Sequence, residues 1–183
     1  MIEQSTKHRR SVRLAGYDYR QGGAYFVTIC AAGRVCSLGQ IRDGLVVPSQ
    51  SGEIAQAAWE AIPAHYGHVS LDAFVMMPNH LHGILLFAAS VEGADGRGTT
   101  YRAPTTERQF GVTQRGSLAD VIGKFKAAVT REINRANGAT AISFWQRNYY
   151  EHIVRNKDGL NRIRQYLADN PARWADDELY AAG

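Results

Sequence analysis

Two histidines, His80 and His82, stand two residues apart in the apolar segment MPNHLHGILL (77–86). In a strand, residues two apart point to the same side, so Leu81 would face the core and both imidazoles would face outward together. Two ring nitrogens spaced in this way can share one divalent metal ion. The alternative is a pair of exposed or hydrogen-bonded strand histidines without a metal, because so short a pattern is common by chance.

A second pair, Tyr166 and Asn170, lies in the segment RQYLADNP (164–171). Residues four apart lie on one face of a helix, one turn from each other. Asn170 could therefore supply a carbonyl oxygen to a metal, and Tyr166 could hold its hydroxyl beside the same metal. The alternative is a tyrosine at the edge of a helix core and an asparagine that ends the helix.

A third cluster mixes aromatic and basic residues in the segment FWQRNYYEHIVRN (144–156). One interpretation is a nucleic-acid face with stacking rings and phosphate-binding arginines. Another is that Tyr149 or Tyr150 is a nucleophile, and a third is an ordinary set of sheet aromatics with one polar histidine. His65 and His68 form a weaker candidate metal pair in a predicted loop.

The elements that must position these residues alternate between strands and helices. We predict strands over 24–32, 68–78, 80–88 and 142–154, with turns at Pro78-Asn79 and, in a short hairpin, at Asp43-Gly44. Helices are predicted over 51–65, over 117–138 and from 158 to just before Pro171. The order β-α-β-β-α-β-α begins with the ferredoxin-like split β-α-β pattern, an α+β fold with an antiparallel sheet and helices on one face.

The chain of 183 residues fits a single domain, with a basic arm at 1–20 and a long mobile loop at about 89–116. Its formal net charge of +4 favours an anionic partner. We see no signal peptide and no apolar run long enough to span a membrane, and two cysteines are too few for a disulfide scaffold. We therefore expect a cytoplasmic protein.

Three segments in order resemble the REP-associated tyrosine transposases, which belong to the single-tyrosine HUH transposases of insertion sequences. They are YFVTIC (25–30), MPNHLHGILL (77–86) and FWQRNYYEHIVRNKDGLNRIRQYLADNPARW (144–174). The resemblance spans about residues 8–174.

The resemblance implies a ferredoxin-like fold and a DNA endonuclease and strand transferase. His80 and His82 would be the metal-binding HUH histidines, Asn170 would complete the site, and Tyr166 would be the catalytic nucleophile. The metal would be magnesium or manganese. A 5′-phosphotyrosine intermediate would let the enzyme rejoin strands in DNA recombination. The alternative is an inactive or domesticated protein that binds hairpin DNA or RNA.

The implied partner is single-stranded or hairpin DNA, from repetitive palindromes or element ends. The protein would act as a monomer or a homodimer. Candidate DNA-binding residues are basic or aromatic, and they are Arg9, Arg10, Arg13, Lys124, Lys126, Arg131, Arg147, Tyr150, His152 and Arg155.

Overall fold

Four antiparallel strands form the central sheet of the computed structural model, which describes residues 22–88, 113–139 and 143–181. The strands are β1 (Gly23–Cys30), β4 (Val69–Met77), β5 (His80–Phe87) and β6 (Tyr150–Val154). Their order in the sheet is β4-β5-β1-β6, with every neighbouring pair antiparallel. This order places the first and third strands of the β-α-β-β-α-β unit at the centre, so the predicted ferredoxin-like α+β fold is confirmed.

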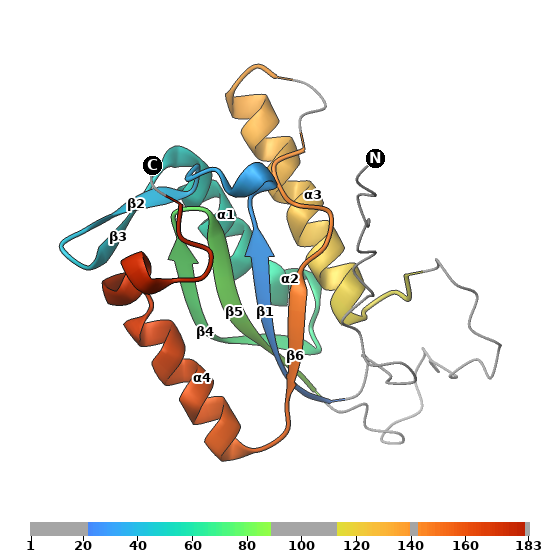
Figure 1. Ribbon diagram of the computed structural model, residues 1–183. Helices are drawn as coiled ribbons and strands as arrows, with labels where there is room; N and C mark the ends of the chain where they lie inside the picture. The colour runs from blue at the N-terminus through green and yellow to red at the C-terminus, as the bar shows by residue number, and fades with distance from the viewer. Residues whose placement is uncertain (1–21, 89–112, 140–142, 182–183) are drawn as a thin grey trace, which may run out of the picture.

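Helices cover both faces of this sheet (Figure 1). The helices α1 (Gln50–Glu60) and α3 (Leu118–Ala136) pack on one face, as predicted for the split β-α-β pattern. Helix α4 (Lys157–Asp169) packs on the opposite face, where Leu167 meets Phe26 and Ile84. The sheet therefore separates a large apolar core from a smaller one, and the smaller one lies beside the predicted site.

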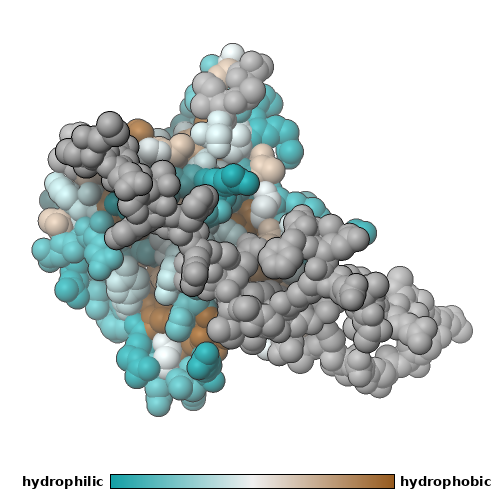
Figure 2. All heavy atoms as spheres, turned by 45° about the vertical axis from the view of Figure 1, so that its right-hand side comes forward, coloured by the Kyte–Doolittle hydropathy of each residue, from teal (hydrophilic) through white to brown (hydrophobic). Residues whose placement is uncertain are grey.

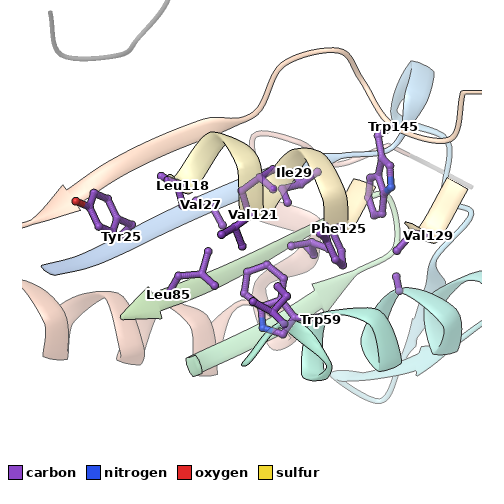
Figure 3. Packing of buried hydrophobic residues seen from close by; sticks show 14 of the residues in the cluster. Tyr25, Val27, Ile29, Trp59, Leu85, Leu118, Val121, Phe125, Val129 and Trp145 are labelled. Atoms are coloured by element: carbon purple, nitrogen blue, oxygen red, sulfur yellow. The ribbon is translucent and has the colours of Figure 1, made fainter. Parts of the chain in front are cut away.

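The large core is built on the apolar stripe of α3 (Figure 3). The buried residues of this stripe are Leu118, Val121, Ile122, Phe125, Val129 and Ile133. Ser117 caps the helix by accepting a hydrogen bond from the backbone N–H of Asp120 at 3.3 Å. These residues pack against the strand side chains opposite them, including Val27 and Leu85.

Two of the predicted elements differ from the structure. The helix expected over 51–65 is interrupted at Ala61, and a short helix α2 (Ile62–His65) follows, because Pro63 has no N–H to continue the first helix. The strand expected over 142–154 is wrong before Tyr150. Trp145 forms only an isolated bridge with Ala31, and its ring is buried in the core.

The smaller elements complete the described chain. The strands β2 (Gly39–Arg42) and β3 (Leu45–Pro48) form the predicted hairpin, in which Asp43 and Gly44 turn the chain with φ of 52° and 73°. Two 3-10 helices, η1 (Ala32–Arg34) and η2 (Pro171–Asp176), follow β1 and α4.

The basic arm at 1–20 and most of the loop at 89–116 lie outside the described residues. Among the helices that the structure describes, none is both long enough and apolar enough to cross a membrane. Figure 2 shows that the described surface on its side of the molecule is mainly hydrophilic, with hydrophobic atoms exposed in a patch low in the view.

Candidate active site

His80 and His82 point to the sheet face that α4 covers. Their Nε2 atoms lie 3.0 Å apart, so the prediction that both rings share one side of β5 is confirmed. The prediction that they face outward is wrong, because both residues are buried. Helix α4 and the segment that follows it cover this face, and Trp174 of η2 packs near the His80 ring.

Burial keeps both imidazoles neutral. It lowers the pKa of His80 from 6.5 to about 4, and the charge of Arg34 acts in the same direction. It lowers the pKa of His82 to about 3, where His80 adds to the effect and Asp177 opposes it. A neutral imidazole carries a lone pair on one ring nitrogen, which is the form that binds metals.

The two Nε2 atoms are close enough to bind one ion together. Ligands on neighbouring positions of one divalent ion lie about 3 Å apart. The donor pair therefore fits a shared divalent cation.

Helix α4 carries Tyr166 to this pair. Asn156 caps the helix by accepting a hydrogen bond from the Gly159 N–H at 2.8 Å. The buried side chain of Leu167 fixes its rotation against the sheet. Tyr166 then places its hydroxyl 3.3 Å from the Nε2 atom of His82.

An ion pair fixes the distance of α4 from β4. The register of β4 against β5 shifts between Leu71 and Phe74. Asp72, within this irregular stretch, accepts hydrogen bonds from Nε and Nη2 of Arg164 at 2.8 and 2.5 Å. Arg164 precedes Tyr166 by two residues, so this contact helps to hold the tyrosine in place.

Tyr166 combines partial burial with access to solvent. Its side chain is 46% exposed. Burial of the hydroxyl raises its pKa above the usual 10, the Asn170 amide opposes this rise, and the carboxylates of Asp177 and Glu178 add to it. The tyrosine is therefore protonated near neutral pH and needs activation before it can act as a nucleophile.

Asn170 supplies an unpaired buried oxygen. The residue is 4% exposed, and its Oδ1 atom has no hydrogen-bond partner in the structure. Buried polar atoms almost always have partners, so an orphaned carbonyl oxygen on a residue that lines the same cleft as His82 is what a cation site would leave. The residues present thus fit the divalent metal that the sequence predicted.

Asp177, just after η2, is a site residue that sequence reasoning missed. Its Oδ2 atom lies 3.9 Å from Nε2 of His80, and its Oδ1 atom accepts a hydrogen bond from the Leu179 N–H at 2.6 Å. One ligand atom each from His80, His82 and Asp177 lie within 4.8 Å of one another. The only signal in the sequence was the acidic run ADDE (175–178), which shows no spacing typical of a metal site.

A cleft opens beside these residues, between β1, β6 and α4. Tyr150 and Tyr166 both line it and are equally exposed, at 46%. The arginines that line it are Arg34, Arg147 and Arg173. Arg34 was not predicted from the sequence, and its backbone φ of 57° is unusual for a residue with a side chain.

The other predicted DNA-binding residues lie in several places. His152 and Arg155 are exposed, on β6 and just after it. Arg131 and Lys126 of α3 line a second cleft, which shares Gln146 and Arg147 with the first. Arg9, Arg10 and Arg13 lie outside the described residues. The DNA contacts of all these residues stay predictions.

The two lysines of α3 have protein partners. Lys126 donates hydrogen bonds to the carbonyls of Gln146 and Arg147 at 2.5 and 3.0 Å, and burial lowers its pKa. Lys124 pairs with Asp120 at 3.3 Å. Lys126 therefore holds the segment that carries Arg147 toward the cleft.

The candidate pair His65 and His68 belongs to no group of three potential metal ligands among the described residues. Over the described ranges, the single cluster of three potential ligands is the one that contains His80. His68 instead donates a hydrogen bond from Nε2 to the carbonyl of Gly116 at 2.9 Å.

Comparison with known proteins gives one strong sequence match and agreement in fold. An uncharacterized protein of Haemophilus influenzae is 38% identical over 173 residues, which cover 94% of this chain and 93% of that protein. No protein-family model matches the chain.

A REP-associated tyrosine transposase, solved bound to a REP hairpin, has a similar structure. It is 16% identical, with a TM-score of 0.52 over 86% of this chain and 71% of that chain. A candidate transposase from Deinococcus radiodurans is also 16% identical, with a TM-score of 0.44 over 86% of this chain and 95% of that one. The first of these two structures confirms the fold that the resemblance implied.

Proposed function

We propose that this chain, which belongs to the family of the Haemophilus influenzae protein, is a transposase-like enzyme that cuts and rejoins single-stranded DNA. It has the fold of a REP-associated tyrosine transposase. Its substrate in this proposal is hairpin DNA with a single-stranded flank, and the structure of similar fold is bound to a REP hairpin. Tyr166 is the nucleophile in this proposal.

One observation carries the proposal. The Tyr166 hydroxyl lies 3.3 Å from a buried, neutral histidine pair whose geometry suits a divalent cation. A metal site and a potential nucleophile thus occupy the same pocket, together with the orphaned oxygen of Asn170. His80, His82, Asn170 and Asp177 would hold the metal.

The bound metal would neutralise charge on the non-bridging oxygens of the scissile phosphate and orient it for in-line attack. Tyr166 attacks the phosphorus, so that a bond forms between its phenolic oxygen and phosphorus as the bond to the 3′ oxygen breaks. The phenolic proton passes to a water molecule in the cleft, and the released 3′ oxygen takes up a proton from water. The product is a 5′-phosphotyrosine and a free 3′-hydroxyl.

The covalent product explains why a tyrosine suits strand transfer. The phosphotyrosine retains the energy of the phosphodiester, so a 3′-hydroxyl can attack it and restore a DNA strand without another source of energy. We propose that Tyr150 stacks on a base next to the cut and that Arg147 pairs with the DNA backbone, because both residues line the cleft. In this proposal, neither Tyr150 nor Arg147 binds the metal.

A covalent-capture assay tests the proposal. Labelled single-stranded hairpin DNA from the flanks of the gene is incubated with the protein and manganese or magnesium, then run on a denaturing gel. We expect a metal-dependent protein–DNA band that Tyr166→Phe abolishes. Tyr150→Phe is the matched control, because Tyr150 lines the same cleft and is equally exposed.

Two outcomes would contradict the proposal. A band that Tyr166→Phe keeps and Tyr150→Phe loses would move the nucleophile to β6. Hairpin binding without any covalent band, with either metal, would instead support an inactive DNA- or RNA-binding protein.

A further inference from the structure

Each histidine of the proposed metal site has an oxygen partner on its other ring nitrogen. The Nδ1 atom of His80 lies 2.8 Å from Oδ1 of Asn79. The Nδ1 atom of His82 lies 2.7 Å from Oγ1 of Thr28 on the neighbouring strand β1. Such partners decide which ring nitrogen carries the proton and which carries the lone pair that a metal can bind.

Asn79 leaves His80 a single neutral form. Its amide nitrogen donates to the carbonyls of Arg34 and Leu179 at 3.2 and 2.8 Å, so its oxygen must be the atom that faces His80. An amide oxygen can only accept a hydrogen bond. The proton of neutral His80 therefore sits on Nδ1, and its Nε2 carries the lone pair.

Thr28 imposes no such choice on His82, because a hydroxyl can donate or accept. The Nε2 atoms of the two rings lie 3.0 Å apart, a hydrogen-bond distance at which one of them must carry a proton. His80 has its proton on Nδ1. Without a metal, His82 must therefore donate from Nε2 to His80, and its own Nδ1 accepts from the Thr28 hydroxyl.

We propose that Asn79 is a positioning residue that holds His80 ready for a metal, and that His82 changes tautomer when the metal binds. The His82 proton then sits on Nδ1 and is donated to Thr28, whose hydroxyl rotates from donor to acceptor. The number of protons on the pair is unchanged. This inference rests on the proposed function, because it takes the two Nε2 atoms as metal ligands.

Asn79 also connects three parts of the chain around the site. The residue is fully buried, in the turn between β4 and β5. Its side chain contacts the backbone of η1 at Arg34 and the backbone at Leu179, two residues after Asp177. The Asn79 amide thus fixes the orientation of the His80 ring and also hydrogen-bonds the segments at Arg34 and Leu179.

Nitrogen-15 NMR of histidine-labelled protein tests the tautomers directly, without DNA and without activity. His80→Gln and His82→Gln assign the two buried rings. In metal-free protein we expect His80 protonated on Nδ1 and His82 protonated on Nε2, and saturating Mg²⁺ should move the His82 proton to Nδ1. Finding His80 protonated on Nε2, or His82 on Nδ1 before metal is added, would overturn the inference.

Two variants at one position separate positioning from simple folding. Asn79→Leu removes the acceptor, and we expect Mn²⁺ to bind about 10- to 100-fold more weakly. Asn79→Asp keeps an oxygen for the His80 N–H but loses both donated hydrogen bonds. It should therefore lose thermal stability yet keep the His80 tautomer and bind Mn²⁺ more tightly than Asn79→Leu.

Equal Mn²⁺ affinity for Asn79→Leu and the unsubstituted protein would refute the positioning role. If the unsubstituted protein binds neither Mn²⁺ nor Mg²⁺, the proposed metal site fails and the change of tautomer at His82 fails with it. The metal-free spectrum still tests the Asn79 assignment in that case, so the two failures are distinguishable.

Discussion

At the scale of single residues, the candidate site pairs buried nitrogen donors with an accessible tyrosine, the proposed nucleophile. His80 and His82 have almost no exposed surface, whereas Tyr166 is nearly half exposed. Burial keeps the histidines neutral without help from a metal, and exposure lets a DNA strand reach the tyrosine. The two requirements are met within one pocket because the histidines lie on a central strand and the tyrosine on a covering helix.

The buried histidines predict loss of stability in acid. Their pKa values, about 4 for His80 and about 3 for His82, lie below the 6.5 of an unfolded chain. At pH values between the folded and unfolded pKa, the unfolded state binds more protons than the folded state. The free energy of unfolding therefore falls as the pH is lowered from 6.5 toward 4. Each histidine contributes a slope of up to about 1.4 kcal/mol per pH unit.

Urea unfolding in EDTA at several pH values measures this effect. His82→Gln should flatten the pH dependence, and His152→Gln, which replaces an exposed histidine on β6, is the control for a His-to-Gln substitution as such. Equal pH dependence for His82→Gln and the unsubstituted protein would contradict the assigned burial effect.

At the scale of elements, the strand β5 carries His80 and His82 on one face and packs against a tryptophan on the other. Trp59 of α1 is buried, and its ring lies over Gly83. A Cβ atom added at Gly83 would come within 2.2 Å of that ring. The glycine therefore allows α1 to approach the strand directly behind His82.

Gly83→Ala should consequently destabilise the protein. The overlap involves a rigid buried ring, and overpacking of this kind costs about 1–3 kcal/mol. Chemical denaturation would measure it. Gly123→Ala on α3 is the matched control, because nothing lies within 4 Å of the Cβ atom it would add. Similar stability for Gly83→Ala and the unsubstituted protein would show that α1 does not pack as described.

The spacing of residues close together in the sequence allowed part of the site to be predicted. Contacts between residues far apart in the sequence could not be predicted in this way. His80 with His82, and Tyr166 with Asn170, share a face because of strand and helix periods that are visible in the sequence. The burial of the histidines depends on α4 lying across the sheet, which no local pattern encodes. Asp177 meets His80 across 97 positions of chain, so spacing carried no signal of it.

The wrong strand prediction has a similar cause. Aromatic composition favoured a strand from 142 onward, but Trp145 inserts its ring into the core, and regular pairing with β1 begins only at Tyr150. The stripe of α3 was predictable because its period of 3.6 residues belongs to one continuous helix.

At the scale of the whole molecule, one chain contains every member of the proposed site. The Tyr166 hydroxyl lies beside His82 of its own chain, and Asn170 and Asp177 come from the same chain. We therefore expect each chain to cut DNA with its own tyrosine, whatever its oligomeric state.

Mixing two inactive variants tests this expectation. His82→Ala keeps the tyrosine, and Tyr166→Phe keeps the metal site. Preincubated together at equal concentration, they should form no covalent DNA adduct, because neither chain has a complete site. Recovery of a substantial fraction of the adduct would mean that subunits share their sites.

Mapping the covalent adduct tests the central claim most directly. The adduct formed with manganese and hairpin DNA is digested with protease and nuclease, and the modified peptide is sequenced by mass spectrometry. We expect a nucleotide 5′-phosphate on Tyr166, in the peptide that spans α4. A phosphate on Tyr149 or Tyr150, or cleaved DNA with no modified tyrosine, would contradict it.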